Sequence, residues 1–364
     1  FLYVEKPALD QLQSNGWSYK DGKELAPDAS DIRSSFKEVV LTPHLDQAIK
    51  RINPWISDEN LRKIIREITV IQTSTLIEAN QWFWERLTQY FSVEQDLGKG
   101  RRGQTVKLID FDNIQNNEFL CVNQFKVQGP TQNIIPDIIL FVNGLPLGVI
   151  ECKSPYAADA VGQGIDQLRR YANLREPETD EGAQKLFWYN QLMVSSCRDL
   201  AKLGTISSSA QHYGDWKDAY PYSDADLQAL RAQPLPGEVS PNHPTGEVPS
   251  PEYLHFMTQV ANGADNPQTE ITAQERLLAG LFSPTNFLDV IQNFIIYSYK
   301  LKNYELENVA AFHLRLGDFI INRQNIEKEK ILYAFKYFTK KLSVSVKIYS
   351  GSTGKNTAGR SAIT

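Results

Sequence analysis

The chain has 364 residues, of which 41% are hydrophobic and 22% charged, so it can build one large globular domain or two ordinary ones. Its longest apolar stretch, residues 134–150, is broken by prolines, a glycine and polar residues, which excludes a membrane-spanning helix of about 20 residues. The net charge of −5 excludes a general attraction to polyanions, so any nucleic acid must be bound locally or with help from partners.

The three cysteines are Cys121, Cys152 and Cys197, and their wide spacing fits neither a disulfide framework nor a structural zinc site. The first ten residues lack the basic start, the apolar core and the small-residue cleavage site of a secretory leader. We therefore expect a cytoplasmic protein without membrane association.

The first predicted elements are helices within residues 28–90. Apolar positions recur every three or four residues in three segments, 36–50, 58–71 and 74–91. Ser57-Asp58 provides a start signal for the second of these helices. This region is a helical lead-in to the elements that follow.

Short β-rich runs replace the helical pattern after residue 104. They lie at 105–111, 118–127, 137–142 and 147–153. Asn143-Gly144 separates the last two runs and is the strongest hairpin signal in the chain. Three further elements follow, a helix at about 159–174, a buried strand within 186–196 and a short strand near 203–208. The alternation of strands and helices predicts an α/β fold.

The C-terminal part of the sequence opens with six prolines between residues 233 and 252, which predict a loop or linker. Beyond it we expect two helices, a strand and a basic helix, at 272–281, 286–299, 319–322 and 327–341. The polar stretch 347–364 is expected to be poorly ordered. The predicted division is therefore a domain over 1–232, a linker over 233–264 and a helical segment over 265–364.

Two carboxylates flank the predicted hairpin. A two-residue turn would pair Asp137 with Ile150, one step from Glu151, whereas a three-residue turn would pair Asp137 with Glu151 directly. Either register brings the two acids together. Mg²⁺ takes hard oxygen ligands from one or two carboxylates, and phosphodiester hydrolysis needs such a metal to neutralise the phosphate and activate water.

Glu151 and Lys153 share one face of their strand because side chains alternate along it. The ammonium can there orient or help to deprotonate the attacking water. Pro136-Asp137 followed by Glu151-Cys152-Lys153 fits the PD-(D/E)xK pattern of nucleases. The alternative is an ordinary strand-start Asp and a solvated Glu–Lys ion pair of little energetic value.

Gln167 and Tyr171 are four residues apart in the run QLRRY, so they lie on one face of the predicted helix. This run matches the QxxxY element of RecB-like nucleases, in which the two side chains support the site and the DNA backbone. Arg169 and Arg170 between them could contact phosphates, or could form the solvated face of the helix.

Longer runs resemble one family. LIDFDNIQNNEFLCVNQFKV, PDIILFVNGLPLGVIECKSP and QLRRY closely resemble the N-terminal nuclease region of the restriction (R) subunit of type I restriction-modification enzymes. TLIEANQWFWERLTQ and NPQTEITAQERLLAGLFSPTNFLDVIQNFI also look like that family. The resemblance runs from about Gly16 to about Phe338.

The resemblance implies a restriction-endonuclease-like mixed β-sheet flanked by helices, with Asp137, Glu151 and Lys153 as catalytic residues. Gln167 and Tyr171 are implied as their support, and Mg²⁺ as the metal. The implied partners are double-stranded DNA and the modification (methyltransferase) and specificity subunits of the same system.

Glu78 occupies a place where nucleases of this class often have an additional metal-site acid, although it can equally be an ordinary exposed helical residue. The complete subunit continues into an ATP-driven helicase-like motor. We therefore expect this chain to be an N-terminal fragment, with ATP bound only through the missing motor. The run GSTGK near the end fails the Walker A pattern because Tyr349 occupies the first glycine position.

Three hypotheses about function follow. The first is a Mg²⁺-dependent endonuclease that, in the full enzyme, is coupled to DNA translocation. The second is a docking module of the R subunit without independent cleavage activity. The third is an unrelated RecB-like repair nuclease.

Overall fold

A computed structural model describes residues 3–98, 100–175, 180–215 and 272–293. Within these ranges seven strands form one mixed sheet in the order β1-β4-β7-β8-β9-β10-β11. The strands are β1 (Ser18–Asp21), β4 (Phe119–Asn123), β7 (Ile138–Val142), β8 (Leu145–Cys152), β9 (Leu192–Ser196), β10 (Ala201–Gly204) and β11 (Gly214–Asp215). The pairs β1/β4 and β8/β9 are parallel, and the other neighbouring pairs are antiparallel.

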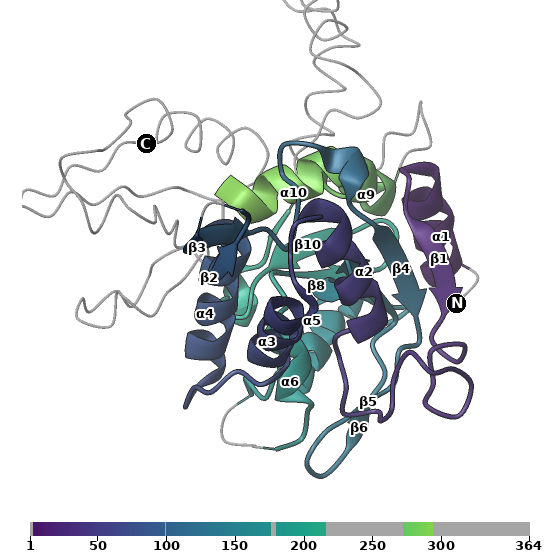
Figure 1. Ribbon diagram of the computed structural model, residues 1–364. Coiled ribbons are helices and arrows are strands. Elements are labelled where there is room, and N and C mark those ends of the chain that lie inside the picture. The colour runs from purple at the N-terminus through teal and green to yellow at the C-terminus, as the bar shows by residue number, and fades with distance from the viewer. Residues whose placement is uncertain (1–2, 99, 176–179, 216–271, 294–364) are drawn as a thin grey trace, which may run out of the picture.

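The centre of the sheet is the core of the molecule. Every residue of β4, β7 and β9 is buried, as are all residues of β8 except the last. Because side chains on both faces of these strands are buried, both faces must be covered, and helices lie on the two sides of the sheet in Figure 1. The predicted α/β class, with a mixed sheet flanked by helices and further helices towards the C-terminal end, is confirmed.

The helical lead-in contains α2 (Thr42–Ile52), α3 (Asp58–Thr69) and α4 (Leu76–Thr88). The second and third predicted helices are confirmed, and Ser57 caps α3 by accepting a hydrogen bond from Asn60 N at 3.3 Å. The first helix begins six residues later than predicted. Residues 36–41 are instead held against the sheet region, because Phe36 O accepts from Gln128 N and Leu41 N donates to Gly144 O.

Two elements before this region were not predicted, α1 (Glu5–Ser14) and the edge strand β1. The predicted strand 105–111 is wrong for most of its length, because β3 (Arg101–Val106) ends at its second residue and pairs with β2 (Phe91–Asp96) in a separate hairpin. The residues that follow β3 form turns, in which Asp110 Oδ1 accepts from Asp112 N and Asn113 N.

The run 118–127 is divided at Gln124, whose φ of 50° ends β4. The chain then enters a small hairpin of β5 (Val127–Gln128) and β6 (Asn133–Ile134). The predicted helix near 159–174 is α5 (Ala160–Tyr171). The run 186–196 contains the predicted strand as β9, but its beginning belongs to the short helix α6 (Gln184–Phe187). This part of the chain also contains two short 3-10 helices, η1 (Ile114–Asn116) and η2 (Ala210–His212).

Two helices near the C-terminal end of the described residues pack into the same core. They are α9 (Ala273–Leu281), as predicted, and α10 (Pro284–Asn293), which begins two residues before the predicted 286. Trp17 Nε1 donates to Phe282 O at 2.6 Å and Trp84 Nε1 to Ile291 O at 3.0 Å, so these helices are attached to both the N-terminal segment and α4.

Several predictions fall outside the described residues: the Pro-rich linker, the part of the second helix after residue 293, the strand 319–322, the helix 327–341 and the end of the chain. The predicted domain boundaries after 232 and 264 lie there too and stay predictions. Within the described part of the chain, no helix combines the length and the apolar character needed to cross a membrane.

Candidate active site

The β7–β8 hairpin positions the two predicted carboxylates. Asn143 and Gly144 form its two-residue turn, with positive φ of 52° and 79°, as the Asn-Gly signal predicts. Next to the turn, Phe141 pairs with Pro146, but beyond a bulge Ile138 pairs with Ile150. The bulge adds one residue to β8, and bulges of this kind re-aim side chains next to active sites.

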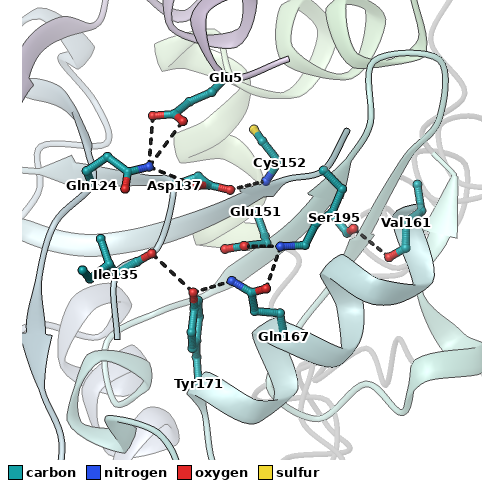
Figure 2. Close-up of polar contacts among 11 residues, drawn as sticks. Glu5, Gln124, Ile135, Asp137, Glu151, Cys152, Val161, Gln167, Tyr171 and Ser195 are labelled. Atoms are coloured by element: carbon teal, nitrogen blue, oxygen red, sulfur yellow. Dashed lines mark hydrogen bonds and ion pairs between the residues drawn. The ribbon is translucent and has the colours of Figure 1, made fainter. Parts of the chain in front are cut away.

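This register places Asp137, the residue before β7, opposite Glu151. The sequence had connected that pairing with a three-residue turn, whereas the molecule reaches it with a two-residue turn and a bulge. The carboxylate of Asp137 is held at both oxygens: Oδ2 accepts from Cys152 N at 2.8 Å and Oδ1 from Gln124 Nε2 at 3.0 Å (Figure 2).

Glu151 lies on β8, across the hairpin from Asp137, in a far less polar place. Its side chain is 1% exposed, and Oε1 accepts from Lys153 Nζ at 2.7 Å. Within the described residues no donor reaches its buried Oε2. Burial, followed by the negative charge of Asp137, raises the pKa of Glu151 to about 8, while the ammonium of Lys153 opposes this increase.

Helix α5 supports the ammonium group. Lys153 Nζ donates to Gln167 Oε1 at 2.6 Å, Gln167 Nε2 donates to the Tyr171 hydroxyl, and that hydroxyl donates to Ile135 O at 3.3 Å (Figure 2). The hydrogen bonds run from Lys153 to the segment between β6 and β7 that leads into Asp137. Gln167 and Tyr171 are therefore brought to the predicted trio, where they hold its lysine.

Close packing of α5 against β9 makes these bonds possible. Ser195 Oγ donates to Val161 O at 2.8 Å, and a Cβ at Gly164 would lie 2.2 Å from Ser195 Oγ. A side chain at Gly164 would displace the Ser195 hydroxyl from its hydrogen bond to Val161 O and so disturb the packing of α5 against β9.

The two arginines of the same helix have different environments. Arg169 donates to Leu174 O at 2.7 Å and so caps the C-terminal end of α5. Arg170 lies 5.1 Å from the centre of the Tyr171 ring and lines a shallow open groove of about 530 Å³ together with Asp166 and Gln167. Of the two, only Arg170 is placed to meet a ligand in that groove.

Glu78 is not brought to this cluster. It forms a capping box with Thr75 at the start of α4, where its carboxylate accepts from Thr75 N at 3.1 Å and from Ser74 Oγ at 2.8 Å. These hydrogen bonds, that from Ser74 foremost, lower the pKa of Glu78. Among the described residues no group of three or more His, Cys, Asp or Glu side chains could hold a metal ion. A metal role for Glu78 therefore has no geometric support.

Sequence reasoning missed Glu5 and Gln124. Glu5, the first residue of α1, is 5% exposed and accepts from Asn123 Nδ2 at 3.1 Å and from Gln124 Nε2 at 3.3 Å. Because the same amide donates to Asp137, Gln124 lies between two carboxylates (Figure 2). Burial foremost, and also the charge of Asp137, raises the pKa of Glu5.

Only one of these two residues had a usable signal in the sequence. Gln124 directly follows a buried strand, a position typical of functional residues, whereas Glu5 belongs to a helix that tertiary packing brings to the site.

The site fits a hard divalent cation. Asp137 and Glu151 offer carboxylate oxygens on opposite sides of the hairpin, and Oε2 of Glu151 is a buried acceptor that no donor reaches within the described residues. Mg²⁺ needs only one or two protein carboxylates because it keeps several waters, so a third acidic ligand is not required.

The chain is similar to endonuclease subunits of type I restriction enzymes. It is 28% identical over 316 residues to the type I restriction enzyme HindI endonuclease subunit of Haemophilus influenzae, which covers 86% of this chain and 26% of that protein. Identity is also 28%, over 300 residues, to a Methanocaldococcus jannaschii protein provisionally named type I restriction enzyme MjaIXP endonuclease subunit, covering 82% of this chain and 25% of that protein. The chain thus spans about a quarter of the length of these relatives.

Residues 2–212, more than half of the chain, match the family described as type I restriction enzyme R protein N terminus. The chain belongs to that family, which confirms the resemblance found in the sequence. The matched region contains the catalytic candidates Asp137, Glu151 and Lys153 as well as Gln167 and Tyr171. Membership in this family supports a nuclease role within the R subunit.

Proposed function

We propose that this chain is the Mg²⁺-dependent DNA endonuclease part of a type I restriction enzyme R subunit, with a PD-(D/E)xK active site. The observation that carries the proposal is the convergence of Asp137, Glu151 and Lys153 at the open end of one hairpin. A buried carboxyl group that has one oxygen without a donor among the described residues, next to a positioned ammonium, is poorly explained by stability alone, and such perturbed groups are concentrated at functional sites.

Asp137 and Glu151 would hold the metal. Mg²⁺ bound there supplies the positive charge that neutralises the scissile phosphate and makes a water more acidic. Glu151, whose pKa is raised to about 8, must give up its carboxyl proton before both of its oxygens can act as ligands. Asp137 needs no rearrangement, because Cys152 N and Gln124 Nε2 already orient its two oxygens.

Lys153 would orient the attacking water and counter the charge that develops on the phosphate. Its ammonium is held by Glu151 Oε1 and Gln167 Oε1, and Gln167 is in turn fixed by the Tyr171 hydroxyl. A donor held on two sides needs little reorganisation when charge develops, which is the basis of electrostatic stabilisation in active sites. Arg170, which lines the neighbouring groove, would contact the DNA backbone.

In the complete enzyme we expect cleavage to be coupled to ATP-driven DNA translocation. ATP would be bound by a motor beyond this chain, and the recognition sequence would be selected by the specificity subunit, with the methyltransferase subunits as further partners. The net charge of −5 is consistent with that division, because the chain has no general electrostatic affinity for DNA. A complex of this kind would act in the cytoplasm.

The two other hypotheses have lost support. Family membership removes an unrelated RecB-like repair nuclease. The docking hypothesis depended partly on helices after residue 272, but α9 and α10 are built into the nuclease core, where Leu281 and Phe287 are fully buried. Docking still predicts that the isolated chain binds the partner subunits, which a pull-down with those subunits measures.

Cleavage of plasmid DNA by the complete R-subunit-containing enzyme, with ATP and Mg²⁺, tests the proposal. Lys153→Ala and Asp137→Ala should each reduce cleavage by at least about 100-fold and leave ATP hydrolysis and translocation intact. Lys50→Ala is the matched control, because Lys50 forms only surface ion pairs with Asp46 and Asp58. Normal cleavage by either active-site variant would refute the assignment.

A further inference from the structure

Gln274, the second residue of α9, joins this helix to two other elements through a buried side-chain amide. Gln274 is 3% exposed. Its Oε1 accepts from Ser196 Oγ at 2.7 Å, and its Nε2 donates to Val4 O at 2.8 Å. A buried amide is costly unless its donor and acceptor both find partners, and here both do.

Ser196 connects Gln274 to the catalytic lysine. Ser196 is the last residue of β9 and lies beside Cys152 in the parallel register of β8 and β9. Its carbonyl accepts from Lys153 N at 2.8 Å. The hydroxyl of Ser196 therefore fixes the strand end to Gln274, while its carbonyl fixes the backbone from which the Lys153 side chain extends.

Val4 connects Gln274 to the catalytic carboxylates. Val4 is the N-cap residue of α1, and Glu5 follows it directly. Glu5 accepts from the Gln124 amide, which also donates to Asp137, as Figure 2 shows. A shift at the start of α1 would therefore move Glu5 and change the contacts that orient Asp137.

Other contacts attach the C-terminal helices without leading to the site. Asn15 Nδ2 donates to Leu278 O at 2.9 Å, and Trp17 Nε1 donates to Phe282 O. Among the residues that the structure describes, neither Asn15 nor Trp17 hydrogen-bonds to a residue that contacts Asp137, Glu151 or Lys153. These contacts keep α9 in place when the Gln274 amide is removed, so the two effects can be separated experimentally.

We propose that Gln274 is a positioning residue, which holds the strand of Lys153 and the helix of Glu5 in the relation that the active site needs. The inference rests on the proposed nuclease function and extends it, because it makes α9, far from the trio in sequence, a part of the catalytic architecture. Displacement of a reacting group by about 1 Å can reduce a rate by about 100-fold, so two hydrogen bonds suffice for a large effect.

The test compares Gln274→Met with Asn15→Ala in the complete enzyme, with plasmid DNA and Mg²⁺. Met keeps the helix propensity and approximate volume of Gln but cannot form either amide hydrogen bond. Gln274→Met should lower the cleavage rate constant at saturating DNA by about 10-fold to 100-fold with little change in the DNA concentration for half-maximal rate. Asn15→Ala should cleave at the rate of the unaltered enzyme.

Ser196→Ala provides a second route if Gln274→Met does not fold. It removes the hydroxyl that donates to Gln274 and that also accepts a long hydrogen bond from Arg198 N at 3.4 Å, and it should lower the same rate constant. When both single variants fold, the double variant should be no slower than the slower single variant, because both changes break one connection. Additive rate losses, or rate losses that follow thermal stability in all variants including Asn15→Ala, would overturn the positioning role.

Lys153→Ala separates this inference from the nuclease proposal. If Lys153→Ala is inactive while Gln274→Met and Ser196→Ala cleave normally, the active site is correct and the positioning role of Gln274 is wrong. If Lys153→Ala cleaves normally, the nuclease assignment itself fails, and Gln274 has no catalytic group to position.

Discussion

The two ends of the β7–β8 hairpin bury polar groups in opposite ways. At the turn, Asn143 is fully buried, yet its Oδ1 accepts from Glu118 N at 2.8 Å and its Nδ2 donates to Leu108 O and Asn117 Oδ1, each at 2.9 Å. At the open end, Glu151 is equally buried, but one of its oxygens meets no donor in the described part of the chain. At the turn, the amide oxygen and nitrogen of Asn143 both have hydrogen-bond partners. At the open end, Oε2 of Glu151 remains available to accept from a ligand.

The carboxyl pKa values differ in the same direction. A hydrogen bond from His44 is the main cause that lowers the pKa of Glu118 near the turn. Burial raises the pKa of Glu151 at the open end to about 8. Glu118 therefore contributes stability that is lost as the pH falls, while ionised Glu151 costs stability that the fold must supply from elsewhere. Such a cost is characteristic of sites selected for function.

The largest effect on cleavage and stability is expected when the carboxyl group of Glu151, at the open end of the hairpin, is replaced by a neutral amide. Glu151→Gln should reduce Mg²⁺-dependent cleavage by at least about 100-fold and also raise the free energy of unfolding at pH 8 by an amount on the order of a few kcal/mol. Because the folded state of the unaltered protein keeps the Glu151 proton up to about pH 8, its stability falls as the pH rises from about 4.5 to about 8. The free energy of unfolding of Glu151→Gln should not show this decrease with rising pH.

Urea denaturation in metal-free buffer across this pH range measures the slope, and plasmid cleavage measures the activity. Equal pH slopes in the two proteins would show that the pKa of Glu151 is not raised in the folded state.

At the turn we expect the opposite, a loss of stability without a loss of cleavage. Asn143→Ala should lower the free energy of unfolding by about 3 kcal/mol, because it leaves buried backbone groups unpaired and places Ala at a positive φ. Cleavage per folded molecule should not change. Asn143→Gly is the matched variant, since it removes the same hydrogen bonds but tolerates this φ, and it should be the more stable of the two. Loss of cleavage by folded Asn143→Gly would contradict the separation of the two ends.

Substitutions of Gln124 test whether the open end of the hairpin depends on a residue with a strained backbone. Gln124→Ala and Gln124→Gly both remove the amide that lies between Glu5 and Asp137, so both should reduce cleavage by about 10-fold. Their stabilities should differ by about 1 kcal/mol in favour of Gly, because only Gly adopts a φ of 50° without steric cost. Equal cleavage by all three proteins would show that Asp137 needs no such support.

Substitutions of Glu78 are expected to have the smallest effect. They distinguish a helix-capping role of this residue from a metal-binding role. Glu78→Ala should slightly lower the melting temperature because it removes half of the capping box, while Glu78→Gln preserves the box. Neither variant should change cleavage at any Mg²⁺ concentration. Loss of cleavage in Glu78→Gln, which keeps the cap but not the charge, would restore a metal role for this residue.

Much of the candidate site could be predicted because its signals are local. The Asn-Gly turn requires positive φ at two adjacent positions, strand alternation places Glu151 and Lys153 on one face, and helical spacing aligns Gln167 with Tyr171. Each of these depends only on neighbouring residues. The sequence reasoning did not place the bulge in β8, although Pro146 and Gly148, which flank its extra residue, are typical of such irregularities.

The sequence by itself thus determined the hairpin, the supporting helix and the family. Only the tertiary structure decided that α1 brings Glu5 to the site, that Glu78 serves a helix cap and that α9 contributes Gln274. The physical reason is the range of the interactions. Turn and periodicity signals arise within a few residues, whereas the contact of Gln274 with Val4 joins segments 270 residues apart and forms only when the core packs them together.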